Sequence, residues 1–327
     1  MSKPLIAIIR GGFTGESVIS MQSADRMMQA VDRDRFDPAF VTVGRDVWSA
    51  EAPDGTSLLL DRGTLTISGR KADGALIAIH GPPGEDGKLQ GFLDVAGIPY
   101  QTGDVLNMAL TFSKHATVST LRQAGFPVAP SVLMDQAGMP ADGKALNDMI
   151  AQTGLPCFVK PDQSGSSLGI SKVNRAEALG AALQKAFKES ELVMVEGALQ
   201  GREFTCGVLR MKDRAIALPV CEIRTTREFF DYHAKYHDPA TEEIIPAPLP
   251  DEVTRLIQAR SVAIFNTLRC RGMARVDHIW DGKEVFTIEV NTTPGFSGAS
   301  IYPKMLEVSG IGVAAAVNGL IEEMVKS

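Results

Sequence analysis

The sequence LIAIIRGGFTGESVISMQSADRMMQAVDRDRFDPAFVTV, residues 5–43, decides the fold class. The apolar run Leu5–Ile9 predicts a buried strand, and Gly11 and Gly12 turn the chain into a helix predicted over about residues 16–31. A second apolar strand is predicted over Phe40–Val43. The order strand, turn, helix, strand is typical of the beginning of a doubly wound α/β domain.

The residues that follow complete a first domain of this type. Residues 45–73 are rich in Gly, Asp and Ser and predict a peripheral excursion. Ala75–Ile79 predicts a further strand, Leu89–Ala96 a helix, and Ile98–Gly103 a strand with a turn. We therefore predict an N-terminal α/β domain with a parallel sheet at residues 1–103.

Two α+β lobes are predicted beyond this domain, a central lobe at residues 104–197 and a C-terminal lobe at residues 198–327. The central lobe begins with one long helix predicted over Asn107–Ala124. A polar stretch over residues 225–245 interrupts the C-terminal lobe, and uninterrupted loops of that length are often functional lids. The other predicted elements are helices over residues 145–152, 175–188, 251–268 and 312–325 and strands over residues 157–160, 192–196, 203–209, 215–224, 274–280 and 285–290.

Composition narrows the possible partners and the compartment. A chain of 327 residues suits two or three domains, and its formal net charge of −6 gives no electrostatic reason to expect nucleic acid or an anionic membrane. The four cysteines are scattered and form no Cys-x-x-Cys pair, which favours reduced thiols in the cytoplasm. No window approaches the roughly 20 apolar residues that span a bilayer. We therefore expect a cytoplasmic protein that binds neither nucleic acid nor a membrane.

The clearest chemical signal is a set of three oxygen-bearing side chains near the end of the chain. Glu289 and Asn291 are two residues apart on a predicted strand, so they point to the same face. A hairpin loop of odd length would place Asp277 opposite Thr287 and on that face. Three oxygen ligands on one face suit a hard cation such as Mg²⁺. Solvated polar residues on a half-exposed strand are the alternative, and this pattern alone leaves it open.

Two glycine-containing turns are candidate phosphate sites. In KPDQSGSSLG, residues 160–169, a lysine at a strand end precedes a Gly/Ser loop that offers backbone N–H groups and hydroxyls. It is not a P-loop, because no Gly-Lys-Ser/Thr follows the glycines, and a flexible surface turn is the alternative. The turn at residues 11–16 lacks the G-x-G-x-x-G pattern, which argues against an NAD site. Taken alone, Glu16 could simply stabilise a helix N-terminus.

Taken together, six segments resemble the D-alanine–D-alanine ligase family. They are GGFTGESVIS (11–20), HGPPGEDGKLQG (80–91), KPDQSGSSLGISKV (160–173), GREFT (201–205), DYHAKYHD (231–238) and RVDHIW…FTIEVNTTPGFSGAS (275–300). Any one of them could arise by chance, but six in order with family-like spacing are a specific signal. The resemblance implies an ATP-grasp fold that follows the N-terminal doubly wound domain.

The resemblance also implies the reaction and its partners. A first D-alanine carboxylate attacks the γ-phosphate of ATP to give an acyl phosphate, and the amine of a second D-alanine then displaces phosphate. Two Mg²⁺ ions (or Mn²⁺) and ATP are the implied cofactor and co-substrate. A homodimer is expected, and the product would serve peptidoglycan precursor synthesis. Phosphoryl transfer between anions needs charge neutralisation and positioning more than covalent help, which agrees with a site without an evident nucleophile.

Site residues follow from the matched positions. The implied metal ligands are Asp277, Glu289 and Asn291. The implied ATP contacts are Lys114, Lys160, Ser166, Ser167, Glu196 (near adenine), Glu203 (near ribose) and Lys235. The implied contacts to D-alanine are Glu16 and His80 for the first molecule and Lys235 and Ser300 for the second. The implied catalytic residues are Arg275 and Gly295, which would stabilise developing charge, and the hydrogen-bonded group Glu16, Ser166 and Tyr236.

Departures from the family pattern remove no catalytic group. Thr14 stands where serine is usual, Gln101-Thr102-Gly103-Asp104 replaces Tyr-Thr-Gly-Ser, and Gly197 follows Glu196 where a longer polar residue is common. Three other functions were weighed: a ligase with D-lactate or D-serine as acceptor, a non-catalytic nucleotide-binding relative, and a Rossmann oxidoreductase. Retention of every matched residue argues against the second, and the missing glycine pattern argues against the third.

We predict that the enzyme makes D-alanyl-D-alanine and essentially no D-alanyl-D-lactate at neutral pH. Lactate-forming relatives typically carry histidine where this chain has Tyr236, and a cationic histidine would repel the acceptor ammonium. Tyrosine, with a pKa of about 10, stays neutral there. Product analysis with equal D-alanine and D-lactate from about pH 6 to 9, around the α-amino pKa of about 8, tests this. Depsipeptide as the main product at neutral pH would contradict it.

Overall fold

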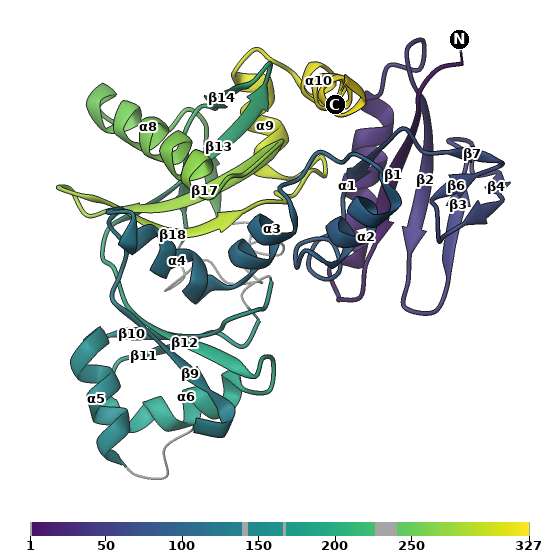
Figure 1. Ribbon diagram of the computed structural model, residues 1–327. Coiled ribbons are helices and arrows are strands. Elements are labelled where there is room, and N and C mark those ends of the chain that lie inside the picture. The colour runs from purple at the N-terminus through teal and green to yellow at the C-terminus, as the bar shows by residue number, and fades with distance from the viewer. Residues whose placement is uncertain (1, 139–142, 166–167, 226–240, 327) are drawn as a thin grey trace.

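The computed structural model describes residues 2–138, 143–165, 168–225 and 241–326, and the statements below refer to these residues. Four of the expected site residues, Ser166, Ser167, Lys235 and Tyr236, lie outside the described residues. Residues 226–240 of the expected lid lie outside them as well. Figure 1 shows three sheet-based bodies, which run from the N-terminal sheet through a small central sheet to the C-terminal sheet.

The N-terminal sheet is centred on β1, whose seven residues are all buried. On either side of β1 lie β2 and β8, both parallel to it, and β3 and β4 extend the β2 side in antiparallel fashion. The bounds are β1 Leu5–Gly11, β2 Asp37–Val43, β3 Trp48–Glu51, β4 Ser57–Leu58 and β8 Gly74–Ile77. The expected excursion thus contains β3, β4 and a small separate sheet of β5 Leu60–Asp61, β6 Thr66–Ile67 and β7 Arg70–Lys71.

Helices cover both faces of this sheet, because successive residues of β1 point to opposite sides. Ile6 and Ile8 belong to a core shared with α1 (Ser17–Ala30) and α10 (Val313–Lys326). The alternate residues of β1 belong to a second core, which includes Leu89 and Leu93 of α2, Lys88–Ala96. The predicted α/β fold class with a doubly wound N-terminal sheet is confirmed, and an antiparallel edge extends its parallel strands.

The last helix returns to the beginning of the chain. Although α10 lies in the expected C-terminal lobe, it packs against α1 and β8 (Figure 1). The Asn318 amide both donates and accepts a hydrogen bond at the C-terminal end of α1. Its Nδ2 donates to Ala30 O at 2.9 Å, and its Oδ1 accepts from Asp32 N at 2.8 Å. The N-terminal and C-terminal sheets therefore share one hydrophobic core.

The central sheet is fully antiparallel and small. Its strand order is β11-β10-β12-β9, and α5 and α6 pack against it over a core of their own. The bounds are β9 Ser131–Asp135, α5 Gly143–Thr153, β10 Cys157–Pro161, β11 Ser171–Val173, α6 Leu179–Ala186 and β12 Leu192–Gly197, with short 3-10 turns at Gln136–Gly138 and Ala176–Ala178.

The C-terminal sheet has the strand order β16-β15-β13-β17-β18, with β14 paired to β13. Helix α8 packs against β13, β14 and β17, and α9 contributes Tyr302, whose hydroxyl donates to Val208 O at 2.8 Å, and Met305 to the shared core. The bounds are β13 Arg202–Met211, β14 Arg214–Ala217, β15 Cys221–Arg224, β16 Glu242–Ile244, α8 Asp251–Thr267, β17 Met273–Trp280, β18 Val285–Asn291 and α9 Ile301–Val308.

Four predictions about elements were wrong. The strand predicted over Ile98–Gly103 is only an isolated bridge, between Tyr100 and Ala75. The stretch 215–224 forms two strands, β14 and β15, which pair with different parts of β13. The end of the predicted loop 225–245 is strand β16, paired with β15. The helix predicted over residues 107–124 is two helices, α3 (Val105–Phe112) and α4 (Lys114–Gln123).

Ser113 separates α3 from α4. Its backbone is extended, with ψ of 114°, so it ends α3, and its Oγ accepts from Ala116 N at 3.1 Å, so it caps the start of α4. This cap places Lys114 at the first position of α4, beside the loop that follows β10 of the central sheet. The hydroxyl of a serine competes with helical hydrogen bonding in this way because it can satisfy a free backbone N–H.

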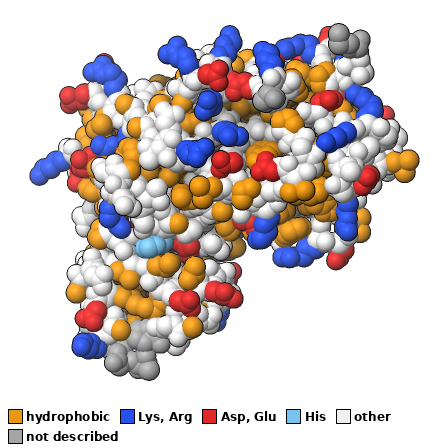
Figure 2. All heavy atoms as spheres, in the orientation of Figure 1, with side chains coloured by type: hydrophobic (Ala, Val, Ile, Leu, Met, Phe, Trp, Pro, Cys, Tyr) orange, Lys and Arg blue, Asp and Glu red, His pale blue; other side chains and the backbone are white. Residues whose placement is uncertain are grey.

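No single described helix has the length and apolarity of a bilayer span. Helices α9 and α10 are long and apolar enough only when they are taken together, and the chain bends by 100° between them. All four cysteines are buried, and none of them forms a disulfide. Side chains of both charges are spread over the face of the molecule that Figure 2 shows.

Replacing Ser113 by alanine should destabilise the protein by about 0.5–2 kcal/mol, because the N-terminus of α4 loses its cap. Thermal unfolding measures the effect. Ser119→Ala in the same helix is the matched control, because the Ser119 hydroxyl has a single side-chain contact, 3.4 Å from His115. Equal effects of the two replacements would contradict the capping role.

Candidate active site

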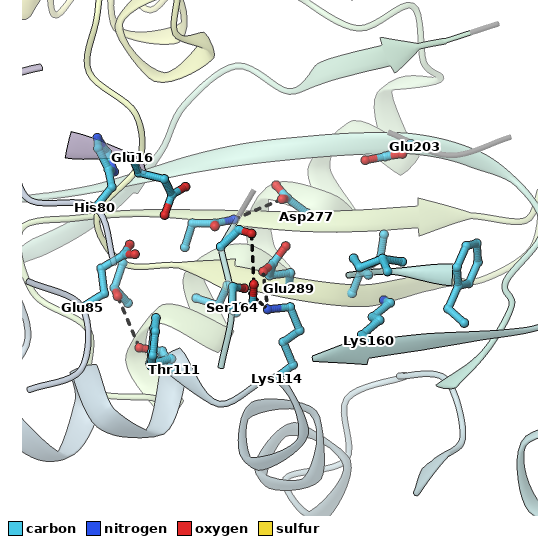
Figure 3. A pocket seen from close by; sticks show the side chains of 18 of the residues that line it. Glu16, His80, Glu85, Thr111, Lys114, Lys160, Ser164, Glu203, Asp277 and Glu289 are labelled. Atoms are coloured by element: carbon cyan, nitrogen blue, oxygen red, sulfur yellow. Dashed lines mark hydrogen bonds and ion pairs between the residues drawn. The ribbon is translucent and has the colours of Figure 1, made fainter. Parts of the chain in front are cut away.

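A cavity of about 210 Å³ lies where the three sheets meet. Its walls come from the loop after β1, the loop after β8, helices α3 and α4, the loop after β10, and strands β13, β17 and β18. Figure 3 shows Glu16, His80 and Glu85 at one end, Lys160 and Glu203 at the other, and Asp277, Glu289 and Lys114 between them. Residues far apart in sequence therefore form one elongated, charged site.

Asp277, Glu289 and Asn291 all line this cavity. The predicted pairing of Asp277 with Thr287 is wrong, because Thr287 pairs with His278 and Asp277 pairs with Glu289. A register shift between Asp277 and His278 accounts for the difference, since a bulge inserts one residue on the β18 side. Asn291 Nδ2 donates to Asp277 Oδ2 at 3.1 Å, so the ends of the two strands remain connected.

Asp277 is a nearly buried carboxylate that is held on several sides. Arg275 binds it through two hydrogen bonds, from Nε to Oδ1 and from Nη2 to Oδ2, each at 2.9 Å. The Thr205 hydroxyl on β13 donates to Oδ1 at 2.6 Å. Arg275 is not among the residues that line the cavity, and it lies beside Asp277 on the same face of β17. A buried charge needs such partners, because its desolvation would otherwise be costly.

Lys114 lies between the metal-ligand candidates and the loop after β10. Its Nζ donates to Ser164 O at 2.6 Å and is 3.8 Å from Glu289 Oε1. The same loop binds the start of α4, because Lys114 N donates to Asp162 O and His115 N donates to Asp162 Oδ1. The N-terminus of α4 and the glycine-containing loop are thus held together beside the cavity.

Lys160 and Glu196 form an ion pair behind one end of the cavity. Lys160 Nζ lies 2.5 Å from Glu196 Oε2, and Lys160 lines the cavity whereas Glu196 does not. Burial alone would lower the pKa of Lys160, but Glu196 and the more distant Glu289 and Glu203 give it a net rise, so the amine is charged. Glu196 Oε1 is buried and has no hydrogen-bond partner among the described residues, so one acceptor remains for a ligand.

Glu16 precedes α1 and points into the cavity from the N-terminal body (Figure 3). Two glycines border its carboxylate: a Cβ at Gly165 would overlap it, and a Cβ at Gly81 would lie 3.4 Å from Oε2. Gly165 belongs to the loop after β10, next to Ser166. The structure therefore brings the N-terminal body and the central loop together at Glu16.

The remaining expected residues lie around the loop that follows β18. Gly295 and Ser300 do not line the cavity, and a Cβ at Gly295 would be 2.9 Å from Ser300 Oγ. Ser300 Oγ accepts from Ser297 N at 3.1 Å and lies 2.9 Å from Ser297 Oγ. His80 is nearly buried at the cavity wall, and burial lowers the pKa of its imidazole, so the ring is neutral.

Comparisons with known proteins agree with this architecture. Models of the D-ala D-ala ligase N-terminus and C-terminus match residues 5–103 and 120–322. The chain belongs to the D-alanine–D-alanine ligase family. It is therefore a ligase with the ATP-grasp fold, as the sequence resemblance predicted.

Relatives of this ligase are similar over nearly their whole length. D-alanine–D-alanine ligases of Bacteroides fragilis and Porphyromonas gingivalis are 38% and 39% identical, covering 97% and 99% of this chain and 98% of each relative. The structure of D-alanyl-alanine synthetase A from Vibrio cholerae matches with a TM-score of 0.87 at 26% identity, covering 100% of this chain and 99% of that one.

Two further solved structures bear on the ligands. The D-Ala:D-Ser ligase VanG from Enterococcus faecalis matches with a TM-score of 0.86 at 31% identity, covering 98% of this chain and 99% of that one. The D-alanine–D-alanine ligase from Bacillus anthracis complexed with ATP matches with a TM-score of 0.79 at 27% identity, covering 100% of this chain and 98% of that one.

Sequence analysis of this ligase missed several residues of the cavity wall. The apolar ones are dispersed along the chain and carry no motif, so only their convergence identifies them: Phe112, Phe158, Ile170, Ile279, Ile288 and Val290. The polar ones are Glu85, Thr111, Ser164 and Thr292. Glu85 was detectable, because it belongs to the HGPPGEDG segment.

Glu85 is a buried acid that also shapes the cavity wall. Its Oε2 accepts from Gly81 N at 2.7 Å, which fixes the turn that follows His80. Burial, and next the charge of Glu16, raise the pKa of Glu85 from 4.5 to about 8, although the Gly81 hydrogen bond opposes the rise. In the ligand-free protein Glu85 is therefore largely protonated at neutral pH.

We expect Glu85→Gln to stabilise the ligand-free ligase relative to wild type, and increasingly so as pH rises. Between its unfolded pKa of 4.5 and its folded pKa of about 8, Glu85 holds a proton that the unfolded chain has lost. The free energy of unfolding of wild type therefore falls through this window by up to about 1.4 kcal/mol per pH unit. Glutamine has no such titration. Thermal unfolding from about pH 5 to 8 measures the difference, and a constant offset would contradict it.

Proposed function

We propose that this ligase joins two molecules of D-alanine at the expense of ATP, giving D-alanyl-D-alanine, ADP and phosphate. One observation carries the proposal: a single cavity combines the carboxylates Asp277 and Glu289 with Lys114 and Lys160, and Glu16 lies at its far end. Asp277 and Glu289 can bind cations, and the two lysines can neutralise phosphate. Beside them, the Glu16 carboxylate can bind an ammonium group, so the set suits phosphoryl transfer to a zwitterionic amino acid. The names of the relatives support the same substrate.

ATP would extend along the cavity with its base at the Lys160 end. Apolar side chains of this end, such as Phe158 and Ile170, offer flat contacts to a base, and Glu203 can accept from ribose hydroxyls. We assign the adenine amino group to Glu196 Oε1, which has no hydrogen-bond partner among the described residues and lies next to Lys160 rather than on the cavity wall. Lys114 and Lys160 would neutralise phosphate oxygens. The relative solved with ATP supports the use of this nucleotide.

Magnesium fits the donor set that the structure shows. Among the described residues no three His, Cys, Asp or Glu side chains form a metal-binding group by themselves, so the amide oxygen of Asn291 must complete the set. Two carboxylates and an amide are hard oxygen donors, as Mg²⁺ prefers. We propose that Asp277, Glu289 and Asn291 hold two Mg²⁺ ions, which would neutralise charge on the triphosphate. Arg275 now binds both oxygens of Asp277 and would share that carboxylate with the metal.

The first D-alanine would bind at the Glu16 end. Its ammonium would face the Glu16 carboxylate, and its carboxylate oxygen would attack the γ-phosphorus while ADP leaves. The negative charge of Glu16 and the neutral His80 distinguish the ammonium end of this subsite from its carboxylate end. Alignment of the two anions by fixed cations is the main contribution that the protein makes to this step.

In the second step the amine of the other D-alanine would attack the acyl carbon, and phosphate would leave. The Gly295 N–H and Arg275 are the groups we assign to the developing negative charge, and Ser300 to the acceptor carboxylate. Close contact of Gly295 with Ser300 supports a shared site, because both lie on one short loop. Roles for Lys235, Tyr236, Ser166 and Ser167 stay expectations from the family resemblance.

D-serine is the second candidate acceptor. The D-Ala:D-Ser ligase structure is 31% identical to this chain, more than the D-alanyl-alanine synthetase A structure at 26%. The curated relatives at 38% and 39% identity are D-alanine–D-alanine ligases, which favours alanine. A hydrophobic pocket rejects an added hydroxyl only weakly, by about 100-fold, so the acceptor needs direct measurement.

The organisation and setting of the enzyme are also proposed from the family. We propose domains at residues 1–103, 104–197 and 198–327, a homodimer, and a cytoplasmic location in which the product enters peptidoglycan precursors. Separate cores beneath the central sheet and beneath the N-terminal sheet support such a division. The shared core that includes α10 indicates that the first and last domains would move together.

Phosphate release is the direct test of the activity. The purified enzyme with ATP and Mg²⁺ would be given D-alanine, L-alanine, D-serine and D-lactate, singly and in pairs, with products identified by mass spectrometry. D-alanine alone should release phosphate and yield the dipeptide, and adding D-serine should yield little mixed product. If none of these substrates caused phosphate release, the proposal would be overturned. If D-alanyl-D-serine formed in preference to D-alanyl-D-alanine, the result would favour D-serine as the acceptor.

Glu289→Gln should lower turnover by at least about 100-fold, because a neutral amide replaces an anionic metal ligand of the same size. The fold should be retained. Glu284→Gln is the matched control on the same hairpin, because Glu284 lies at the turn and pairs with Arg260 at 2.9 Å, away from the cavity. Phosphate release over a range of Mg²⁺ concentrations measures the effect. Near wild-type turnover of Glu289→Gln at ordinary Mg²⁺ would contradict its role as a ligand.

A further inference from the structure

Ser23 is a buried residue of α1, only 1% exposed, and its hydroxyl lies between two parts of the active site. Its Oγ is 3.1 Å from His80 Nε2. Phe296 N donates to the same Oγ, also at 3.1 Å. Ser23 therefore contacts a first-substrate residue and the residue that follows Gly295.

The backbone at Thr293 assigns the hydrogen atoms of this group. Ser23 Oγ carries one proton and two lone pairs, so the Phe296 amide fills one lone pair and leaves Oγ able either to donate to His80 Nε2 or to accept from it. His80 also has a hydrogen bond with the Thr293 backbone that favours a protonated ring nitrogen, as donation to the carbonyl would. Because Nε2 faces Ser23, we assign this donor to Nδ1; the buried ring is neutral, so Nε2 then has no proton and accepts from the Ser23 hydroxyl.

These contacts join three segments that are distant in sequence. Ser23 lies on α1, which begins just after Glu16, His80 follows β8, and Thr293 and Phe296 belong to the loop after β18. The N-terminal body thus holds the C-terminal loop at the point where both subsites meet. Phe296 is fully buried in the shared core, so the loop keeps apolar support of its own without Ser23.

We propose that Ser23 is a positioning residue that holds His80 in one neutral tautomer and fixes the Phe296 amide, thereby aligning Gly295 with the first-substrate subsite. The tautomer part depends only on the ligand-free structure, whereas the alignment part rests on the proposed function. Helix α1 does not need the Ser23 hydroxyl for its own structure, because Ser23 is not its cap. Among the described residues the hydroxyl makes only these two hydrogen bonds.

Kinetics of Ser23→Ala test the alignment. The expected result is a fall of about 10- to 100-fold in kcat/KM for the first D-alanine, because small misplacement of reacting groups is costly, with the KM for ATP little changed. Ser23→Cys keeps a weak donor of similar size and should lie between wild type and alanine. Ser20→Ala is the matched control: Ser20 is fully buried one turn earlier on α1, and its Oγ accepts from Gly11 N at 3.0 Å without contacting His80.

Nitrogen-15 NMR of histidine-labelled, ligand-free enzyme tests the tautomer without any activity. The His80 signals are identified by their absence in His80→Gln. Wild type and Ser20→Ala should show an unprotonated Nε2 and a protonated Nδ1, and Ser23→Ala should lose this preference. A protonated Nε2 in wild type, or unchanged spectra and kinetics in Ser23→Ala, would overturn the proposal. An enzyme that forms no dipeptide would overturn the proposed function, while the spectra would still decide the Ser23 assignment.

Discussion

The bonding of Asp277 is the interaction on which the rest of the site depends. A carboxylate that is only 9% exposed is stable beside other acids only if cations and donors surround it, and Arg275, Thr205 and Asn291 do so. These partners lie on β17, β13 and β18, so one charge connects three adjacent strands. The bulge beside Asp277 keeps this arrangement and directs Glu289 into the same cavity.

The cavity also requires three bodies to approach each other closely. Glycine makes this possible at Glu16, because a side chain at Gly165 would overlap the carboxylate. The shared core of α1, α9 and α10 holds the N-terminal and C-terminal sheets together, while the central sheet has a core of its own. A central lobe with a separate core can move relative to the rest, and such motion commonly admits and encloses substrates in enzymes of this kind.

Acidic and basic side chains line the cavity together. Glu16, Glu85 and Glu289 lie along it with Lys114 and Lys160. Burial and the neighbouring Glu16 raise the pKa of Glu85 to about 8, so this acid adds little negative charge at neutral pH. The other carboxylates suit the ammonium and metal partners that we propose.

The sequence by itself determined the fold class and the family, and it predicted charged residues that the structure brings to one cavity, because these depend on local periodicity and on short motifs whose residues act together. It could not determine the break at Ser113, since helical periodicity continues through it, nor the register at Asp277, since a bulge depends on packing across strands. Only the tertiary structure revealed the contacts of Glu85 with Gly81 and of Ser23 with His80 and Phe296. The physical reason is that protonation, tautomer and buried hydrogen bonding depend on residues that are neighbours in space and distant in sequence.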